Sequence, residues 1–220
     1  TGGRYHRLLL IEGTESHPPL VYATHRSQGL AVIDRSDPNA LSRVHQISKQ
    51  NLGGLSRRGD FVYIIKHDGD LTVMDVSDPV SPVEGATVDA DGHPWNVVSG
   101  ADTLYTADNT HGVGVFSLDA PAVPTFEGHI DIGTGALDVA VDSEHLYVAG
   151  GSAGMIVLDL SDPNRPEEIA RLNLDAPIID IALDGSIAWL VDQESVWAVD
   201  ISTPAQPIVL GKAGTPLFAM

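Results

Sequence analysis

Hydrophobic and polar residues alternate in short runs along the chain, and residues 135–174 show the pattern most clearly. The apolar runs of this stretch are residues 137–141, 146–149, 155–160 and 168–174. Two-residue periodicity with β-branched side chains, and turn residues between the runs, is typical of β-strands. Because proline presets φ, the Asp-Pro pair after the third run favours a tight turn. The stretch therefore predicts a four-stranded antiparallel meander.

The same unit repeats along the chain, and a proline after the third run marks each copy. These prolines are Pro38, Pro79, Pro121, Pro163 and Pro204, at spacings of 41, 42, 42 and 41 residues. An aromatic residue in the second run recurs as Tyr22, Tyr63, Tyr105, Tyr147 and Trp189. A period near forty residues with four strands indicates a β-propeller blade. The sequence predicts an all-β propeller with five four-stranded antiparallel blades and the repeated aromatics buried between blades.

The repeat also predicts the boundaries of the blades within a single domain. They are expected at residues 1–48, 49–90, 91–132, 133–174 and 175–213. Residues 214–220 look like the start of the inner strand of a further blade. Two explanations stay open for this segment. The favoured one is that the polypeptide continues beyond Met220 into further blades or domains, and the other is that the segment fills an irregular place in a five-bladed ring.

The third runs carry a family resemblance. They read AVIDRSDP, TVMDVSDP and IVLDLSDP in three of the copies. An apolar run that leads into Asp-x-Ser-Asp-Pro resembles the LVIVD repeat, a propeller family of bacterial and archaeal secreted or surface proteins. The resemblance implies the fold and a module found inside larger proteins. It implies no single activity, so it transfers no catalytic residues to this chain.

Composition and charge narrow the possible partners. The formal net charge is −18, with only three lysines among the basic residues. Such a surface repels phosphate groups, so nucleic acid and anionic lipid are not expected partners. The chain has no cysteine, which excludes disulfides and thiolate sites. No apolar run approaches the ~20 residues of a membrane-spanning helix. The acidic surface suits an extracellular or cell-surface location, with the periplasm as a further possibility.

Antiparallel wiring places the loops between second and third strands on the same face as the links between blades. Propellers usually bind ligands on this face, around the mouth of the channel, although this is an analogy at the level of the fold. The ligand-binding candidates there are His25, His67, His93, Asp108, His111 and Asp192. The histidines could ligate a transition metal, but their offsets in successive blades differ, so we favour ordinary loop histidines.

A second candidate is a cation site in the channel. Asn96, Asp138 and Asp180 stand at equivalent positions near the start of three inner strands, where their oxygens could converge on Ca²⁺. Blades one and two have Gly13 and Gly54 there, so the set is incomplete. The favoured interpretation is that these groups bond backbone or water, and no cofactor is expected.

Two classes of function remain. The favoured one is a non-catalytic binding or scaffolding module of a secreted or cell-surface protein, with a protein or carbohydrate partner at the channel mouth. The alternative is an extracellular enzyme or metal-binding propeller with a polar site at the channel mouth, acting for example on a polysaccharide. The chain contains no HExxH, and no catalytic residues are assigned.

Overall fold

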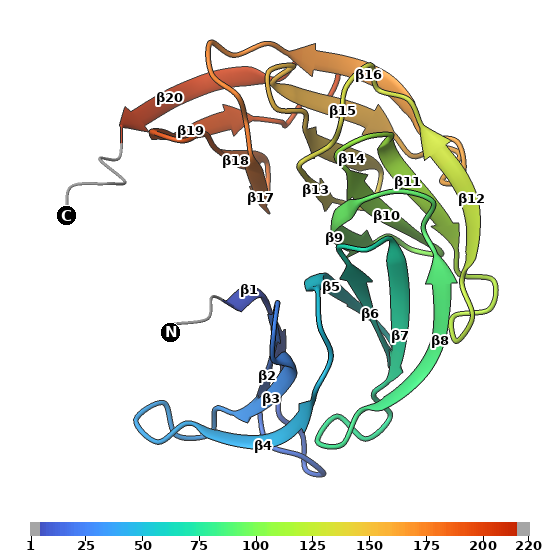
Figure 1. The fold of residues 1–220 in the computed structure, drawn as a ribbon. Coiled ribbons are helices and arrows are strands. Elements are labelled where there is room, and N and C mark those ends of the chain that lie inside the picture. The colour runs from blue at the N-terminus through green and yellow to red at the C-terminus, as the bar shows by residue number, and fades with distance from the viewer. Residues whose placement is uncertain (1–4, 215–220) are drawn as a thin grey trace. The chain divides into compact units, whose positions relative to one another are not determined.

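The computed structural model describes residues 5–214, and these residues form twenty β-strands and no helix (Figure 1). The strands of blade one are β1 (Tyr5–Ile11), β2 (Leu20–His25), β3 (Gly29–Asp34) and β4 (Ser42–Ile47). Blade two contains β5 (Leu52–Arg58), β6 (Phe61–Lys66), β7 (Asp70–Asp75) and β8 (Val83–Asp89). Blade three contains β9 (Pro94–Ser99), β10 (Thr103–Asp108), β11 (Gly112–Ser117) and β12 (Thr125–Ile130).

The last two blades follow the same plan. Blade four contains β13 (Asp138–Val141), β14 (His145–Ala149), β15 (Met155–Asp159) and β16 (Glu167–Leu172). Blade five contains β17 (Asp180–Asp184), β18 (Ile187–Val191), β19 (Ser195–Asp200) and β20 (Ile208–Gly214). Within each sheet the four strands lie in chain order. The prediction of an all-β propeller with four-stranded antiparallel blades is confirmed.

The end of the last blade bears on the predicted further strand. Gly214 belongs to β20, where it pairs with Ser195. Residues 215–220 lie outside the described residues, so an inner strand in 214–220 stays a prediction.

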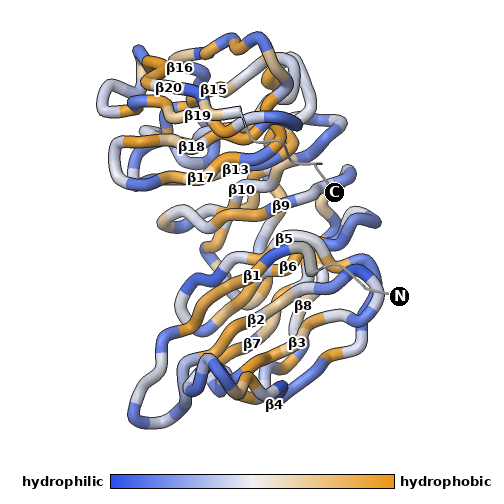
Figure 2. The backbone as a smooth tube through the Cα atoms, turned by 90° about the vertical axis from the view of Figure 1, so that its left-hand side faces the viewer, coloured by the Kyte–Doolittle hydropathy of each residue, from blue (hydrophilic) through white to orange (hydrophobic). Residues whose placement is uncertain are grey.

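The chain divides into two compact units. The first comprises residues 1–97 and 118–126, and the second comprises residues 98–117 and 127–220. Each unit has a hydrophobic core of its own, built from the alternating residues of its strands. Figure 2 shows hydrophobic colour mostly along the strands and hydrophilic colour mostly at the loops. First strands of successive blades lie side by side, β1 with β5 in the first unit and β13 with β17 in the second.

Three of the repeated tyrosines connect their blade to the next one. The side chains of Tyr22, Tyr63 and Tyr105 are fully buried, as predicted. Their hydroxyls donate to the backbone oxygens of Pro79 at 2.6 Å, Pro121 at 3.0 Å and Pro163 at 2.9 Å, respectively. These acceptors are the prolines that mark the repeat in the sequence. The tyrosine and the proline recur together because each pair bonds two neighbouring blades.

The prediction of buried aromatics is wrong for Trp189, whose side chain is 42% exposed. Blade five is followed by no blade among residues 5–214, so its second strand has no next blade to pack against. Tyr147 is buried, but its hydroxyl donates to Asp142 Oδ2 of its own blade at 3.1 Å. The aromatic position is thus buried in four of the five repeats.

Hydrogen bonds from the backbone to aspartate side chains form the Asp-Pro turn in every blade that carries it. Asp37, Asp78 and Asp162 each accept a hydrogen bond at Oδ1 from the backbone N–H two residues later. The last residue of the third strand does the same for the serine that follows it. Two consecutive Asx turns therefore reverse the chain between third and fourth strands.

Candidate functional site

The loops between second and third strands bond to the link that leaves the same blade. In the first unit Asn51 N donates to Arg26 O at 2.7 Å, and Ala90 N donates to Gly69 O at 2.7 Å. In the second unit Ala136 N donates to Asp108 O at 2.8 Å, and Gly151 forms a β-bridge with Ile178. The expectation that these loops and links share one face of each blade is confirmed. We call this side of a blade the loop–link face.

Two of the ligand-binding candidates close their own hairpins. His25 Nδ1 accepts hydrogen bonds from Ser27 N and Gln28 N, both at 3.1 Å, and the side chain is buried. Asp108 Oδ1 accepts from Thr110 N at 2.7 Å and from His111 N at 2.8 Å. Both residues end a second strand and both satisfy the N–H groups of the loop that follows. Capping of the hairpin explains a buried polar group at this position.

Asp192 of blade five is also tied into its surroundings. Its carboxylate accepts from Glu194 N at 2.6 Å and from Trp197 Nε1 at 2.8 Å. Burial opposes the charged carboxylate, but these hydrogen bonds outweigh it and the pKa of Asp192 lies below its usual value. Lys212 Nζ lies 3.8 Å from Asp192 Oδ2 and 4.2 Å from the centre of the Trp197 ring. Blade five therefore holds a lysine between a carboxylate and an indole.

The remaining loop candidates of the first unit gather around Trp95, the second residue of β9. The Trp95 indole is 48% exposed. The His67 ring lies 4.9 Å from it, centre to centre, at a tilt of 60°. The hairpin of His67 bonds the link that carries His93, through Gly69 and Ala90, and His93 is exposed. Asp68 and Asp91 add exposed carboxylates from the same two segments. We call His67, Asp68, Asp91, His93 and Trp95 the Trp95 patch.

The three residues of the predicted cation site are divided between the two units. Asn96 belongs to the first unit, where its side chain occupies the space that a Cβ on Gly54 would need. Asp138 and Asp180 belong to the second unit and lie close together, because Asp138 Oδ2 accepts from Ile181 N at 3.3 Å while Asp180 Oδ1 bonds the same N–H at 2.9 Å. Shared Ca²⁺ binding by the three side chains stays a prediction.

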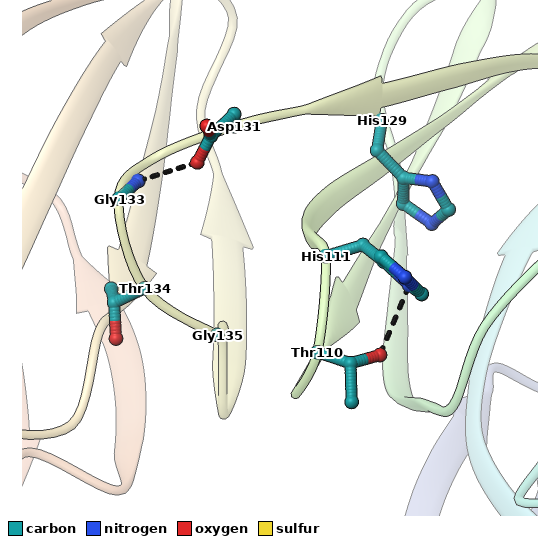
Figure 3. A pocket seen from close by; sticks show the side chains of 7 residues that line it. All are labelled: Thr110, His111, His129, Asp131, Gly133, Thr134 and Gly135. Carbon is teal, nitrogen blue, oxygen red and sulfur yellow. Dashed lines mark hydrogen bonds between the residues drawn. The ribbon is translucent and has the colours of Figure 1, made fainter.

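A polar hollow of about 600 Å³ opens on the loop–link face of the second unit (Figure 3). Its lining comes from the hairpin after β10, the end of β12 and the link that follows: Thr110, His111, His129, Asp131, Gly133, Thr134 and Gly135. The rings of His111 and His129 lie 4.8 Å apart, centre to centre. His111 is about half exposed, and its Nδ1 is 3.0 Å from Thr110 Oγ1 and 3.4 Å from Asp108 Oδ1.

Asp108, His111 and His129 form the cluster with metal-ligand chemistry among the described residues. One ligand atom from each lies within 4.8 Å of the other two. Sequence reasoning selected Asp108 and His111 but missed His129, which lies outside the loops, on β12. It also placed no site residue at Trp95. The repeat spacing offers a signal for His129. It stands 83 residues, or two repeat lengths, after Gln46, so a histidine replaces a glutamine at the same position of the fourth strand.

Comparison with protein families decides the assignment of the repeats. The model of the LVIVD repeat matches residues 54–90, 133–173 and 178–215, which together make up more than half of the chain. The chain belongs to the LVIVD repeat family. The matches cover blades two, four and five of this LVIVD-repeat protein. No curated protein is similar enough to match.

Solved structures share the fold of the LVIVD-repeat chain at low sequence identity. A functionally unknown protein from Desulfotomaculum acetoxidans matches with a TM-score of 0.72 and 13% identity, over 96% of this chain and 71% of the other. The β-propeller domain of Cps50 (Swd1) from Myceliophteria thermophila matches with a TM-score of 0.70 and 11% identity, over 97% and 75%. A protein from Lactobacillus plantarum matches with a TM-score of 0.71 and 17% identity, over 96% and 68%. At these identities the likeness concerns the fold alone.

The structure was also searched for membrane-spanning helices. Among residues 5–214, no helix has the length and apolar character that crossing a bilayer requires.

Proposed function

We propose that the chain is a non-catalytic binding module whose Trp95 patch holds a basic side chain of a protein partner. The observation that carries the proposal is the exposed indole of Trp95, supported from the side by the His67 ring. Tryptophan is over-represented among the residues that dominate the binding energy of protein interfaces. An indole face that solvent can reach, on an end of the blade built from loops, is suited to such a contact.

Charge favours a lysine or arginine as the partner group. Asp68 and Asp91 stand exposed in the two segments that frame Trp95, and the whole chain has a formal net charge of −18. A cation over an indole face is attracted by the ring quadrupole, and nearby carboxylates add to that attraction. Lys212 makes this arrangement inside blade five, between Trp197 and Asp192. The Trp95 patch presents the indole and the Asp91 carboxylate to an external cation, whereas Asp68 already pairs with Lys66 Nζ at 3.1 Å.

The proposal includes an extracellular or cell-surface location. It is supported by the acidic surface, which suits exposure to a saline medium, and by the resemblance of the repeats to those of secreted propellers. Fractionation of the source cells with an antibody to the chain tests this part, and a purely cytoplasmic signal would contradict it.

Selection from a random peptide library displayed on phage tests the binding role. The immobilised 220-residue chain should enrich peptides that contain arginine or lysine. Recovery should be lost with Trp95→Ala, which removes the indole, and kept with Trp189→Ala, a matched loss of an exposed tryptophan in another blade. Enrichment that is equal on all three proteins would contradict the assignment of the patch.

A glycan array, probed with the same three proteins, distinguishes the kind of partner. The proposal predicts no glycan whose binding depends on Trp95. Glycan binding that Trp95→Ala abolishes would replace the protein partner with a carbohydrate. A chain that selects neither peptides nor glycans would contradict a binding role for this patch.

A further inference from the structure

The cluster of Asp108, His111 and His129 lies in the second unit and is separate from the Trp95 patch, which belongs to the first. The Asp108 carboxylate is buried and held in one orientation by three hydrogen bonds to Oδ1, from Thr110 N, Thr110 Oγ1 and His111 N. The His111 imidazole comes from the hairpin after β10 and the His129 imidazole from β12, and they lie beside each other next to the hollow of Figure 3. Two neighbouring imidazoles therefore border one solvent-accessible space, and a fixed, buried carboxylate lies within 4.8 Å of their ligand atoms.

We propose that Asp108, His111 and His129 bind a divalent transition metal ion, with Zn²⁺ as the ion that suits the site. Two imidazole nitrogens and one carboxylate oxygen are a ligand set that Zn²⁺ accepts, and three protein ligands leave a coordination position open. The hollow supplies the space for that position, which water or a ligand fills. The chain thus has a second binding site that is chemically different from the indole of Trp95.

The distances fit a metal after a small adjustment. Asp108 Oδ1 and His111 Nδ1 are 3.4 Å apart. Ligand atoms that lie about 2.1 Å from a tetrahedral zinc are separated by roughly 3.4 Å. The three ligand atoms lie within 4.8 Å of one another, so the longest separation must shorten by up to about 1.4 Å to reach that of a tetrahedral zinc site. The His111 side chain is exposed enough to rotate, and at Nδ1 it would exchange the Thr110 hydrogen bond for a bond to the metal.

The repeat supplies an internal comparison that separates a metal site from a structural one. Gly112 and Gly29 have the same positive φ of 91° at the end of equivalent hairpins, so His111 corresponds to Gln28. By the repeat spacing His129 corresponds to Gln46. Blade one forms the same hairpin and the same fourth strand with glutamines at both positions. The fold therefore does not require two histidines here, and their presence in blade three fits a ligand role.

Blade one also supplies the test variant. The double substitution His111→Gln with His129→Gln gives blade three the side chains that blade one carries, so it should fold. The matched control is His45→Gln, which removes a histidine from β4 next to Gln46. Each purified protein is stripped of metal with a chelator and titrated with zinc chloride in a calorimeter, and its melting temperature is recorded with and without zinc.

The proposal predicts one zinc ion per chain for the natural protein and for His45→Gln. The double variant should bind at least tenfold more weakly. Zinc should raise the melting temperature of the first two proteins and leave that of the double variant unchanged, since an ion that binds the native state stabilises it. Equal zinc binding by the natural chain and by a folded double variant would overturn the proposal, as would the absence of binding to the natural chain. If the double variant does not fold without zinc, His111→Gln alone gives the same readout.

Discussion

The second-strand tyrosine of blades one, two and three contributes to stability in two ways. Its ring fills the space between strands, and its hydroxyl satisfies a backbone oxygen of the next blade. For Tyr63 that oxygen belongs to Pro121, at 3.0 Å. Burial raises the pKa of Tyr63 to about 12, because the neutral phenol is favoured where solvent cannot reach the charged form. The hydroxyl is thus retained as a hydrogen-bond donor through the physiological range.

Removal of this hydroxyl should have a measurable cost. Tyr63→Phe should lower the free energy of unfolding by about 1 kcal/mol, since it deletes one hydrogen bond and leaves the Pro121 oxygen without its donor. Tyr147→Ala should cost more, roughly 3–5 kcal/mol, because it also leaves a cavity in the core. Urea unfolding followed by circular dichroism measures both values. Trp189→Phe is the control and should change little, as its ring is exposed. A Tyr63→Phe chain as stable as the natural one would show that the blade-to-blade bond contributes nothing.

The elements of each blade were predictable because their determinants are local in sequence. Strand alternation, the Asp-Pro turns and the 41–42-residue spacing all lie within one repeat. The exposure of Trp189 was not predictable in this way, since it depends on which strands pack against blade five. His129 was missed for a similar reason. It lies on β12, and its neighbour His111 lies in the hairpin between β10 and β11. Contacts between repeats and between distant strands require the three-dimensional arrangement.

The turns that follow the third strands should make the stability of the fold depend on pH in the acid range. Hydrogen bonds from the following serines hold the pKa values of Asp34, Asp75, Asp159 and Asp200 below the usual range. A carboxyl with a lower pKa in the folded chain than in the unfolded chain stabilises the fold above its unfolded pKa, near 3.9. That stabilisation is lost as the pH falls through the folded values. The effect is modest, because these carboxyls are exposed to solvent.

The corresponding experiment compares urea midpoints between about pH 2 and pH 6. The natural chain should lose stability as the pH drops below about 4, since protonation removes the charged acceptors of the four turns. A variant with asparagine at all four positions keeps a neutral oxygen acceptor and should show a shallower loss. Parallel curves for the two proteins would mean that these turns do not contribute to the acid sensitivity.

At the scale of the whole molecule, repetition specifies the fold and departures from repetition mark the sites. Asp37 and its equivalents recur and form turns. Trp95, His111 and His129 do not recur, and they border the two surfaces to which we assign binding. The sequence alone identified the loop–link face and several of its residues. It could not identify which side chains of that face meet, because those contacts join different strands, hairpins and links.

The central claim is that Trp95 is the main contact for a basic partner, and a binding constant tests it most directly. A labelled arginine-containing peptide, selected on the natural chain, is titrated against the natural protein, Trp95→Ala and Trp189→Ala by fluorescence anisotropy. The account predicts that Trp95→Ala weakens binding at least tenfold, which corresponds to about 1.4 kcal/mol, and that Trp189→Ala leaves it unchanged. It also predicts weaker binding to the natural chain at higher salt, because the exposed Asp91 carboxylate and the net charge of −18 attract the peptide through charges that salt screens. Equal affinity of the natural chain and Trp95→Ala for the peptide would contradict the account.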